Sequence, residues 1–169
     1  DRYLTPAEFG RVMRYLALYA RKPRARHETV DALRLCLTTP LRSGEVVTLT
    51  RSEVSPTGDY VSLVDAKTGD RKVWLGPHAQ AIVQRRRSRT QRASDYLFPG
   101  RTHGHLWQSS LSHRWREIAD GLGLEDVHLH DLRHTWASLA LQSGEKMDVL
   151  RLSLGHTTEH MTARSAHRG

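Results

Sequence analysis

Cysteine, lysine and long apolar runs are all scarce in this sequence. A single cysteine, Cys36, among 169 residues excludes an internal disulfide framework and a metal site built from cysteines, and it favours a reducing cytoplasm as the location. No apolar run is long enough to cross a membrane, so we expect no membrane partner. The chain starts at Asp1 with neither methionine nor an apolar signal core, which we interpret as a domain whose upstream region was removed.

The charge balance is strongly basic. Lysine and arginine total 26 against 18 aspartate and glutamate residues, which gives a net charge of +8 and an isoelectric point near 10.2. This excess favours a polyanionic partner and makes salt-sensitive nucleic-acid binding the first hypothesis. Lysine occurs only at Lys22, Lys67, Lys72 and Lys146, so arginine supplies most of the charge. Either phosphate recognition or an arginine-biased genome would explain that usage.

Helical spacing is the main pattern of the apolar residues in this sequence. It predicts one mainly α-helical domain over residues 1–169 with a small antiparallel β-sheet, an α+β fold. The expected helices lie at about residues 6–19, 30–37, 77–87, 110–121, 130–143 and 146–154. Either Ser109 or Ser110 is the expected N-cap of the fourth of these helices. We find no internal repeat.

The segment between the second and third helices has strand character. Residues 60–64 and 71–75 are rich in β-branched and aromatic residues, and a turn-forming sequence at 67–70 separates them. They predict a β-hairpin, with a third strand before it. The connection from 88 to 104 is rich in glycine, proline and histidine, and its length is typical of a functional loop.

Two arginines stand in compact polar motifs far apart in the chain. Arg42 lies in TPLRSGE and Arg133 in HDLRHT. A guanidinium is permanently charged, and its fork of donors matches the paired oxygens of a phosphate. His130 precedes Arg133 by three residues, which places both on one side of the first turn of a helix. The motifs therefore predict a clamp that neutralises charge on phosphorus during a displacement.

Four motifs together resemble a known family. They are Arg42 in TPLRSGE, Lys67 in AKTGDRKVWL, Arg133 in HDLRHTWASLAL and His156 in LSLGH. In this order, and across a helix–hairpin–helix layout, the chain resembles the catalytic domain of the tyrosine recombinases, or phage integrases. The resemblance covers most of the chain. It departs from the usual pattern at Pro40, where glycine is frequent.

The resemblance implies site-specific exchange of DNA strands without metal or cofactor. In the family a tyrosine attacks the scissile phosphate and forms a covalent 3′-phosphotyrosyl intermediate. Carried over, Arg42 and Arg133 would hold the nonbridging oxygens, and Lys67 would protonate the departing 5′ oxygen. His130 would assist proton transfer, and His156 would hydrogen-bond the phosphate.

Two of these assignments have competitors. Glu45 would support the site by pairing with a basic partner, but a plain ion pair between Glu45 and Arg42 at a helix end is the commoner use of such residues. Lys67 beside a turn is often only an exposed lysine, and Lys72 on the next strand is a competing candidate for the acid. The order of the motifs favours the catalytic interpretation.

The family's nucleophile position holds Ser165 instead of tyrosine. A serine oxygen lies several ångströms closer to its own backbone, and misplacing a reacting atom by about 1 Å can cost on the order of 10²-fold in rate. An alkanol is also far less acidic than a phenol. We therefore expect a cleavage-inactive domain, arising most simply from an introduced substitution, with natural loss of activity as the alternative.

Histidines raise the question of a metal site. His128, His130 and His134 lie close in sequence, as do His156 and His160. No HExxH motif occurs, and neighbouring arginines would repel a divalent cation. We expect no metal.

The arginine cluster Arg85, Arg86 and Arg87 is interpreted as a contact for the DNA backbone, with a solvated helix face as the simpler alternative. We expect the tryptophans to be core or partly buried packing residues. They are Trp74, Trp107, Trp115 and Trp136.

The resemblance also implies partners. They are double-stranded DNA at specific sites, an upstream DNA-binding domain outside this chain, and a homotetramer on DNA, while this fragment alone would be a monomer. A recombinase-like regulator that binds DNA without cutting it is the alternative function.

Overall fold

The computed structural model describes residues 2–64, 69–89, 95–102 and 104–144. The described part is mainly helical with a two-stranded antiparallel sheet, as the sequence predicts. In chain order its elements are α1 (Pro6–Tyr19), α2 (His27–Thr38), α3 (Ser43–Val47), the 3₁₀ helix η1 (Arg51–Glu53), β1 (Tyr60–Leu63), β2 (Arg71–Trp74), α4 (Pro77–Arg89), α5 (Gln108–Gly121) and α6 (Asp131–Gln142). The helix expected at 146–154 lies outside the described residues.

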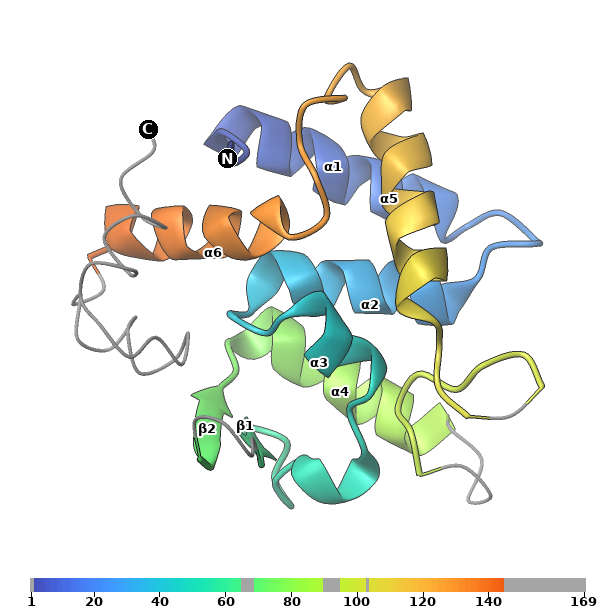
Figure 1. The fold of residues 1–169 in the computed structure, drawn as a ribbon, viewed down its shortest axis with the longest axis vertical. Coiled ribbons are helices and arrows are strands. Elements are labelled where there is room, and N and C mark those ends of the chain that lie inside the picture. Colours follow the sequence, from blue (N-terminus) through green and yellow to red (C-terminus); the bar gives the residue numbers. More distant parts are fainter. Residues whose placement is uncertain (1, 65–68, 90–94, 103, 145–169) are drawn as a thin grey trace.

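Helix α2 is the centre of the molecule, and Figure 1 shows the other helices around it. It packs against α3, α4, α5 and α6. Most of its side chains are buried, including Val30, Leu33 and Leu37 at helical spacing. Because α2 is covered on several sides, its two ends fix the positions of the segments that meet there.

The hairpin pairs β1 with β2 in the register Tyr60↔Trp74 to Leu63↔Arg71. The expectation of a third strand before the hairpin is wrong. In its place the described chain forms η1, and one isolated bridge joins Val54 to Val61. The cause is Glu53, whose carboxylate accepts hydrogen bonds from the N–H and hydroxyl of Thr50 at 2.8 and 3.0 Å and closes a turn there.

Two further local expectations need correction. Helix α5 has Trp107 as its N-cap, without a side-chain cap, so neither Ser109 nor Ser110 caps it. The chain stays extended up to Leu106, whose N–H bonds the Phe98 carbonyl at 2.6 Å, and the helix starts directly afterwards. The expectation of core or partly buried tryptophans is wrong for Trp74 and Trp107, which are 62% and 69% exposed.

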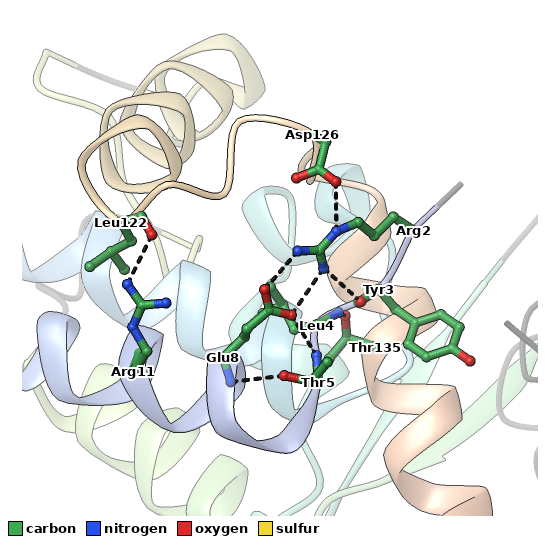
Figure 2. Close-up of polar contacts among 9 residues, drawn as sticks. All are labelled: Arg2, Tyr3, Leu4, Thr5, Glu8, Arg11, Leu122, Asp126 and Thr135. Atoms are coloured by element: carbon green, nitrogen blue, oxygen red, sulfur yellow. Dashed lines mark hydrogen bonds and ion pairs between the residues drawn. The ribbon is translucent and has the colours of Figure 1, made fainter. Parts of the chain in front are cut away.

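The N-terminal segment is fastened to two distant parts of the chain (Figure 2). Arg2 forms ion pairs with Glu8 at 2.6 Å and with Asp126, before α6, at 2.7 Å. The N–H of Leu4 donates to the hydroxyl of Thr135 on α6 at 2.9 Å. These contacts fix α6 against the start of the chain. Among the described residues, no helix has the length and apolar content needed to span a membrane.

Candidate functional site

Arg42 lies at the junction between α2 and α3. Helix α2 ends at Thr38, the chain is extended at Thr39, and Arg42 is the N-cap of α3. Leu41, which is 1% exposed, anchors this junction in the core, whereas the Arg42 side chain is 44% exposed. The junction therefore holds the backbone firmly and leaves the guanidinium open to a ligand.

Glu45 connects α3 to the hairpin. Its carboxylate accepts two hydrogen bonds from Arg71, from Nη1 at 2.6 Å and from Nη2 at 2.9 Å, and a third from the Arg42 N–H at 2.8 Å. Arg42 Nη1 lies 3.7 Å from the same carboxylate. Burial raises the pKa of Glu45, but the bonds from Arg71 and the Arg42 N–H outweigh it, so the pKa lies below its ordinary value. Glu45 is therefore ionised and orients both arginines.

Arg133 enters the same region from the first turn of α6. Its Nε donates to the Pro40 carbonyl at 2.8 Å. That carbonyl lies beyond the end of α2, so it has no helical donor. Burial, and then the positive charge of Arg42, lower the pKa of Arg133 to about 10. The guanidinium stays charged at neutral pH and would gain from an anion placed between it and Arg42.

Two histidines border Arg133 on α6. His130 is the exposed N-cap, and its Nε2 lies 3.3 Å from Asp131 Oδ1. His134 is half-buried, and burial lowers its pKa below the ordinary value. Donor atoms of His130, Asp131 and His134 lie within 4.8 Å of one another, so these residue types could hold a metal ion. The adjacent Arg133 and the positive N-terminal end of α6 oppose a cation there.

These side chains surround one cavity of about 620 Å³. Its lining includes Arg42, Glu45, His130, Arg133 and His134, together with Cys36, Ser43 and Gln108. The structure thus brings Arg42, Glu45, His130 and Arg133 together, although up to ninety residues separate them in sequence. The expected residues Lys67, His156 and Ser165 lie outside the described part of the chain.

Arg71 is a site residue that sequence reasoning missed. It is the first residue of β2, two positions before Val73, which is 0% exposed. The strand period of two places both on the inward face, and an arginine on such a face needs a carboxylate partner. That signal was available in the sequence. The competing candidate Lys72 points elsewhere, with its ammonium 4.7 Å from the centre of the Tyr60 ring.

The arginine cluster of α4 makes contacts inside the protein. Arg86 is 5% exposed, and its Nε lies 3.3 Å from the buried carboxylate of Asp31 on α2. Arg85 pairs with the same carboxylate at 2.6 Å, and Arg87 donates to the Ser55 carbonyl at 2.9 Å. The cluster fastens α4 to its neighbours. A role in DNA contact remains a prediction for the partly exposed Arg85 and Arg87.

The arrangement suits one kind of ligand. Two guanidinium groups and two imidazoles line a cavity whose one carboxylate, Glu45, is already neutralised by Arg71. A tetrahedral oxyanion such as a phosphate diester would receive paired hydrogen bonds from the arginines. Charge developing on its oxygens during a displacement would be stabilised by groups already in place.

Comparison with known proteins agrees with this geometry. The model of the phage integrase family matches residues 2–168. This chain belongs to the phage integrase family. Among similar sequences are the tyrosine recombinase XerC of Xanthomonas axonopodis pv. citri, 31% identical over 119 residues that cover 69% of this chain and 39% of XerC, and the shufflon-specific DNA recombinase of Escherichia coli, 28% identical over 178 residues that cover 99% of this chain and 40% of the relative.

Solved structures show the same fold. XerA recombinase superposes with a TM-score of 0.82 at 22% identity, over 100% of this chain and 61% of that one. XerH recombinase bound to its difH substrate superposes with a TM-score of 0.83 at 19% identity, over 100% of this chain and 51% of that one. The fold is therefore that of tyrosine recombinase catalytic domains. The chain spans about two fifths of the length of the XerC and shufflon relatives that it matches.

Proposed function

We propose that this chain is the catalytic domain of a site-specific DNA recombinase and that its cavity binds the scissile phosphate. The proposal rests on the observation that Arg42 and Arg133 line one cavity. Glu45, which pairs with Arg71, holds Arg42 in position there. Family membership supports DNA recombination as the reaction. XerH, one of the structural neighbours, is bound to its DNA substrate, which supports duplex DNA as the partner.

Each residue has a role in the proposed reaction. Arg42 and Arg133 bind the two nonbridging oxygens and stabilise the charge that develops there. His130, which lines the cavity, assists proton transfer during activation of the nucleophile. Lys67 protonates the departing 5′ oxygen, and His156 hydrogen-bonds the phosphate.

We further propose that the chain as written binds DNA without cleaving it, because Ser165 replaces the nucleophilic tyrosine. A serine hydroxyl is both too short and too weakly acidic to replace a phenol in a site arranged for one. A tyrosine at this position completes the nucleophile, so Ser165→Tyr should restore formation of a covalent protein–DNA bond.

The test uses the full-length protein, its cognate DNA site and a chelator. Ser165→Tyr should form a covalent adduct that survives denaturation, whereas the starting protein and Ser165→Phe, which adds a ring without a hydroxyl, should form none. An adduct formed by the starting protein would contradict the proposed inactivity. Absence of an adduct with Ser165→Tyr would count against the recombinase function, and dependence on a divalent metal would favour the histidine-based alternative.

The natural residue at position 165 also decides between the two candidate functions. If serine is the natural residue there, a recombinase-like protein that binds DNA without cutting becomes the better description. We propose that the full-length protein assembles as a homotetramer on DNA in either case. Sedimentation of the full-length protein with and without its site tests this assembly.

A further inference from the structure

Asp131, the first residue of α6, has a buried carboxylate whose two oxygens differ in their contacts. The residue is 1% exposed. Its Oδ2 accepts a hydrogen bond from the N–H of His128 at 2.8 Å, whereas Oδ1 has no hydrogen-bond partner among the described residues. A buried oxygen without a partner is rare in folded proteins, because it loses water and gains nothing in return. A capping role therefore explains only one of the two oxygens.

The other oxygen lies close to the ring of His130. Nε2 of His130 is 3.3 Å from Asp131 Oδ1. The imidazole is 64% exposed and lines the cavity that Arg42 and Arg133 also line. A carboxylate oxygen only accepts hydrogen bonds, so a bond between these two atoms requires the ring proton on Nε2. A small rotation of the exposed ring brings that N–H into line with the oxygen.

Two further histidines limit the orientations of this ring. His128, before α6, lies parallel to His130 with the ring centroids 6.4 Å apart, and His134 meets its edge at 5.8 Å. Burial lowers the pKa of His134 below its ordinary value, so this neighbour is neutral at neutral pH. It therefore does not oppose a positive charge on His130.

Other carboxylates face His130 from α3 and α5. Glu45 of α3 lines the same cavity, but its carboxylate already binds Arg71. Asp120 of α5 lines a neighbouring cavity of about 260 Å³ that His130 borders as well. Asp120 is exposed, so water screens its charge. Asp131 differs from both, because it combines burial, an oxygen without a hydrogen bond and a short distance to the ring.

We propose that Asp131 is a positioning residue that fixes the proton of the His130 imidazole on Nε2. The proposal deepens the proposed function and rests on it for the chemical step. With Nε2–H bonded to Asp131, the lone pair of the ring is on Nδ1, which becomes the atom that accepts a proton.

The proton then follows a defined route in a protein that has tyrosine at position 165. The phenol loses its proton to Nδ1 of His130 while its oxygen bonds to phosphorus. The bond from phosphorus to the 5′ oxygen breaks, and Lys67 donates a proton to that oxygen. The carboxylate of Asp131 stabilises the imidazolium that results.

The tautomer of His130 can be measured in the chain as written, without any cleavage. Nitrogen-15 chemical shifts of the neutral ring should show Nε2 protonated and Nδ1 unprotonated. In Asp131→Asn the amide oxygen can still accept from the His128 N–H, so the amide nitrogen faces His130 and donates to Nε2. The ring should then change to the Nδ1–H tautomer. An Nδ1–H ring in the chain as written, or the same tautomer in both proteins, would overturn the proposal and leave the proposed function intact.

The second measurement is the rate of covalent adduct formation by full-length Ser165→Tyr on its cognate site. Adding Asp131→Asn should lower the rate at saturating DNA roughly 10²-fold, with the Kd for DNA changed by less than about twofold, because proton transfer and not binding is lost. The matched control is Asp120→Asn, which removes an exposed carboxylate near His130 and should react as Ser165→Tyr does.

His130→Ala separates positioning from a purely structural role. If Asp131 acts through His130, Asp131→Asn should lower the rate no further once His130→Ala is present. An equal loss in both backgrounds would mean that Asp131 only supports the fold. If Asp131→Asn does not fold, the tautomer in the chain as written decides. Absence of any adduct with Ser165→Tyr would count against the proposed function, whereas the tautomer comparison would still decide the role of Asp131.

Discussion

Glu45 is the carboxylate on which two arginines of the candidate site converge. Arg71, 8% exposed, gives it two short hydrogen bonds, and the Arg42 backbone gives a third. A buried guanidinium without its carboxylate would keep its charge but lose its partner, which is more costly than never having buried the pair. The orientation of Arg42 therefore depends on the neighbouring Glu45 carboxylate.

Glu45→Gln should lower the free energy of unfolding by about 3 kcal/mol at neutral pH, because it leaves Arg71 buried without a counter-charge. Urea unfolding of the variant and the parent measures the difference. Arg71→Lys is the companion variant, and it should lose less, since it keeps the charge but not the paired hydrogen bonds. A loss below about 0.5 kcal/mol in Glu45→Gln would show that the pair is not structural.

Protonation of Glu45 should contribute to the pH dependence of the free energy of unfolding. Its pKa is lowered from 4.5 in the folded chain, so below pH 4.5 the unfolded chain takes up the proton first and unfolding becomes more favourable. The stabilisation is thus present above pH 4.5 and is lost as the pH falls through the folded pKa. The difference between parent and Glu45→Gln should shrink over that interval in acid titrations followed by circular dichroism, and a constant difference would contradict the assignment.

At the scale of elements, α6 depends on the start of the chain. Thr135 accepts from the Leu4 N–H and donates to the Asp131 carbonyl, both at 2.9 Å, and it is fully buried. Thr135→Val keeps the shape but leaves the Leu4 N–H without an acceptor, which should cost about 2 kcal/mol of unfolding free energy. Thr135→Ser retains the hydroxyl and is the control. Equal stability of the two variants would show that this hydrogen bond does not fasten α6.

Helices α2 and α4 are joined through Asp31. Its side chain is 4% exposed and lies near Arg85 and Arg86. Asp31→Asn should lower the free energy of unfolding by about 3 kcal/mol, because the buried Arg86 loses its nearer carboxylate and keeps only the more distant Glu28, at 3.8 Å. Glu117→Gln, in an exposed pair with Arg114, should change it by less than about 0.5 kcal/mol. Similar losses in both variants would argue against a structural role for the α4 cluster.

Helices α1, α2, α4, α5 and α6 were predictable to within a few residues, because local signals mark their ends, whereas the expected ranges did not include the short α3. Thr5 and Glu8 form the capping box that begins α1 where the sequence places it, and Pro6 is the first helical residue. The expectation of a third strand failed for a different reason. Hydrogen bonds from Thr50 to Glu53 close a turn that competes with strand pairing, and such a turn leaves no periodic pattern in the sequence. The exposed Trp74 and Trp107 show that residue type alone does not decide burial.

At the scale of the molecule, motif order was enough to predict that Arg42, Glu45, His130 and Arg133 share a cavity. Predicting the role of Arg71 required knowing which carboxylate lies opposite the inward face of β2. That depends on how the hairpin packs against α3.

If the scissile phosphate binds in the cavity that Arg42 and Arg133 line, Arg42→Gln should lower the slope of log K against log salt by about 0.9, because one phosphate contact is lost. Fluorescence anisotropy of a duplex that carries the cognate site, measured across a salt series, gives the slope for the variant and the parent. An unchanged slope would mean that the Arg42 guanidinium does not contact a phosphate in the complex.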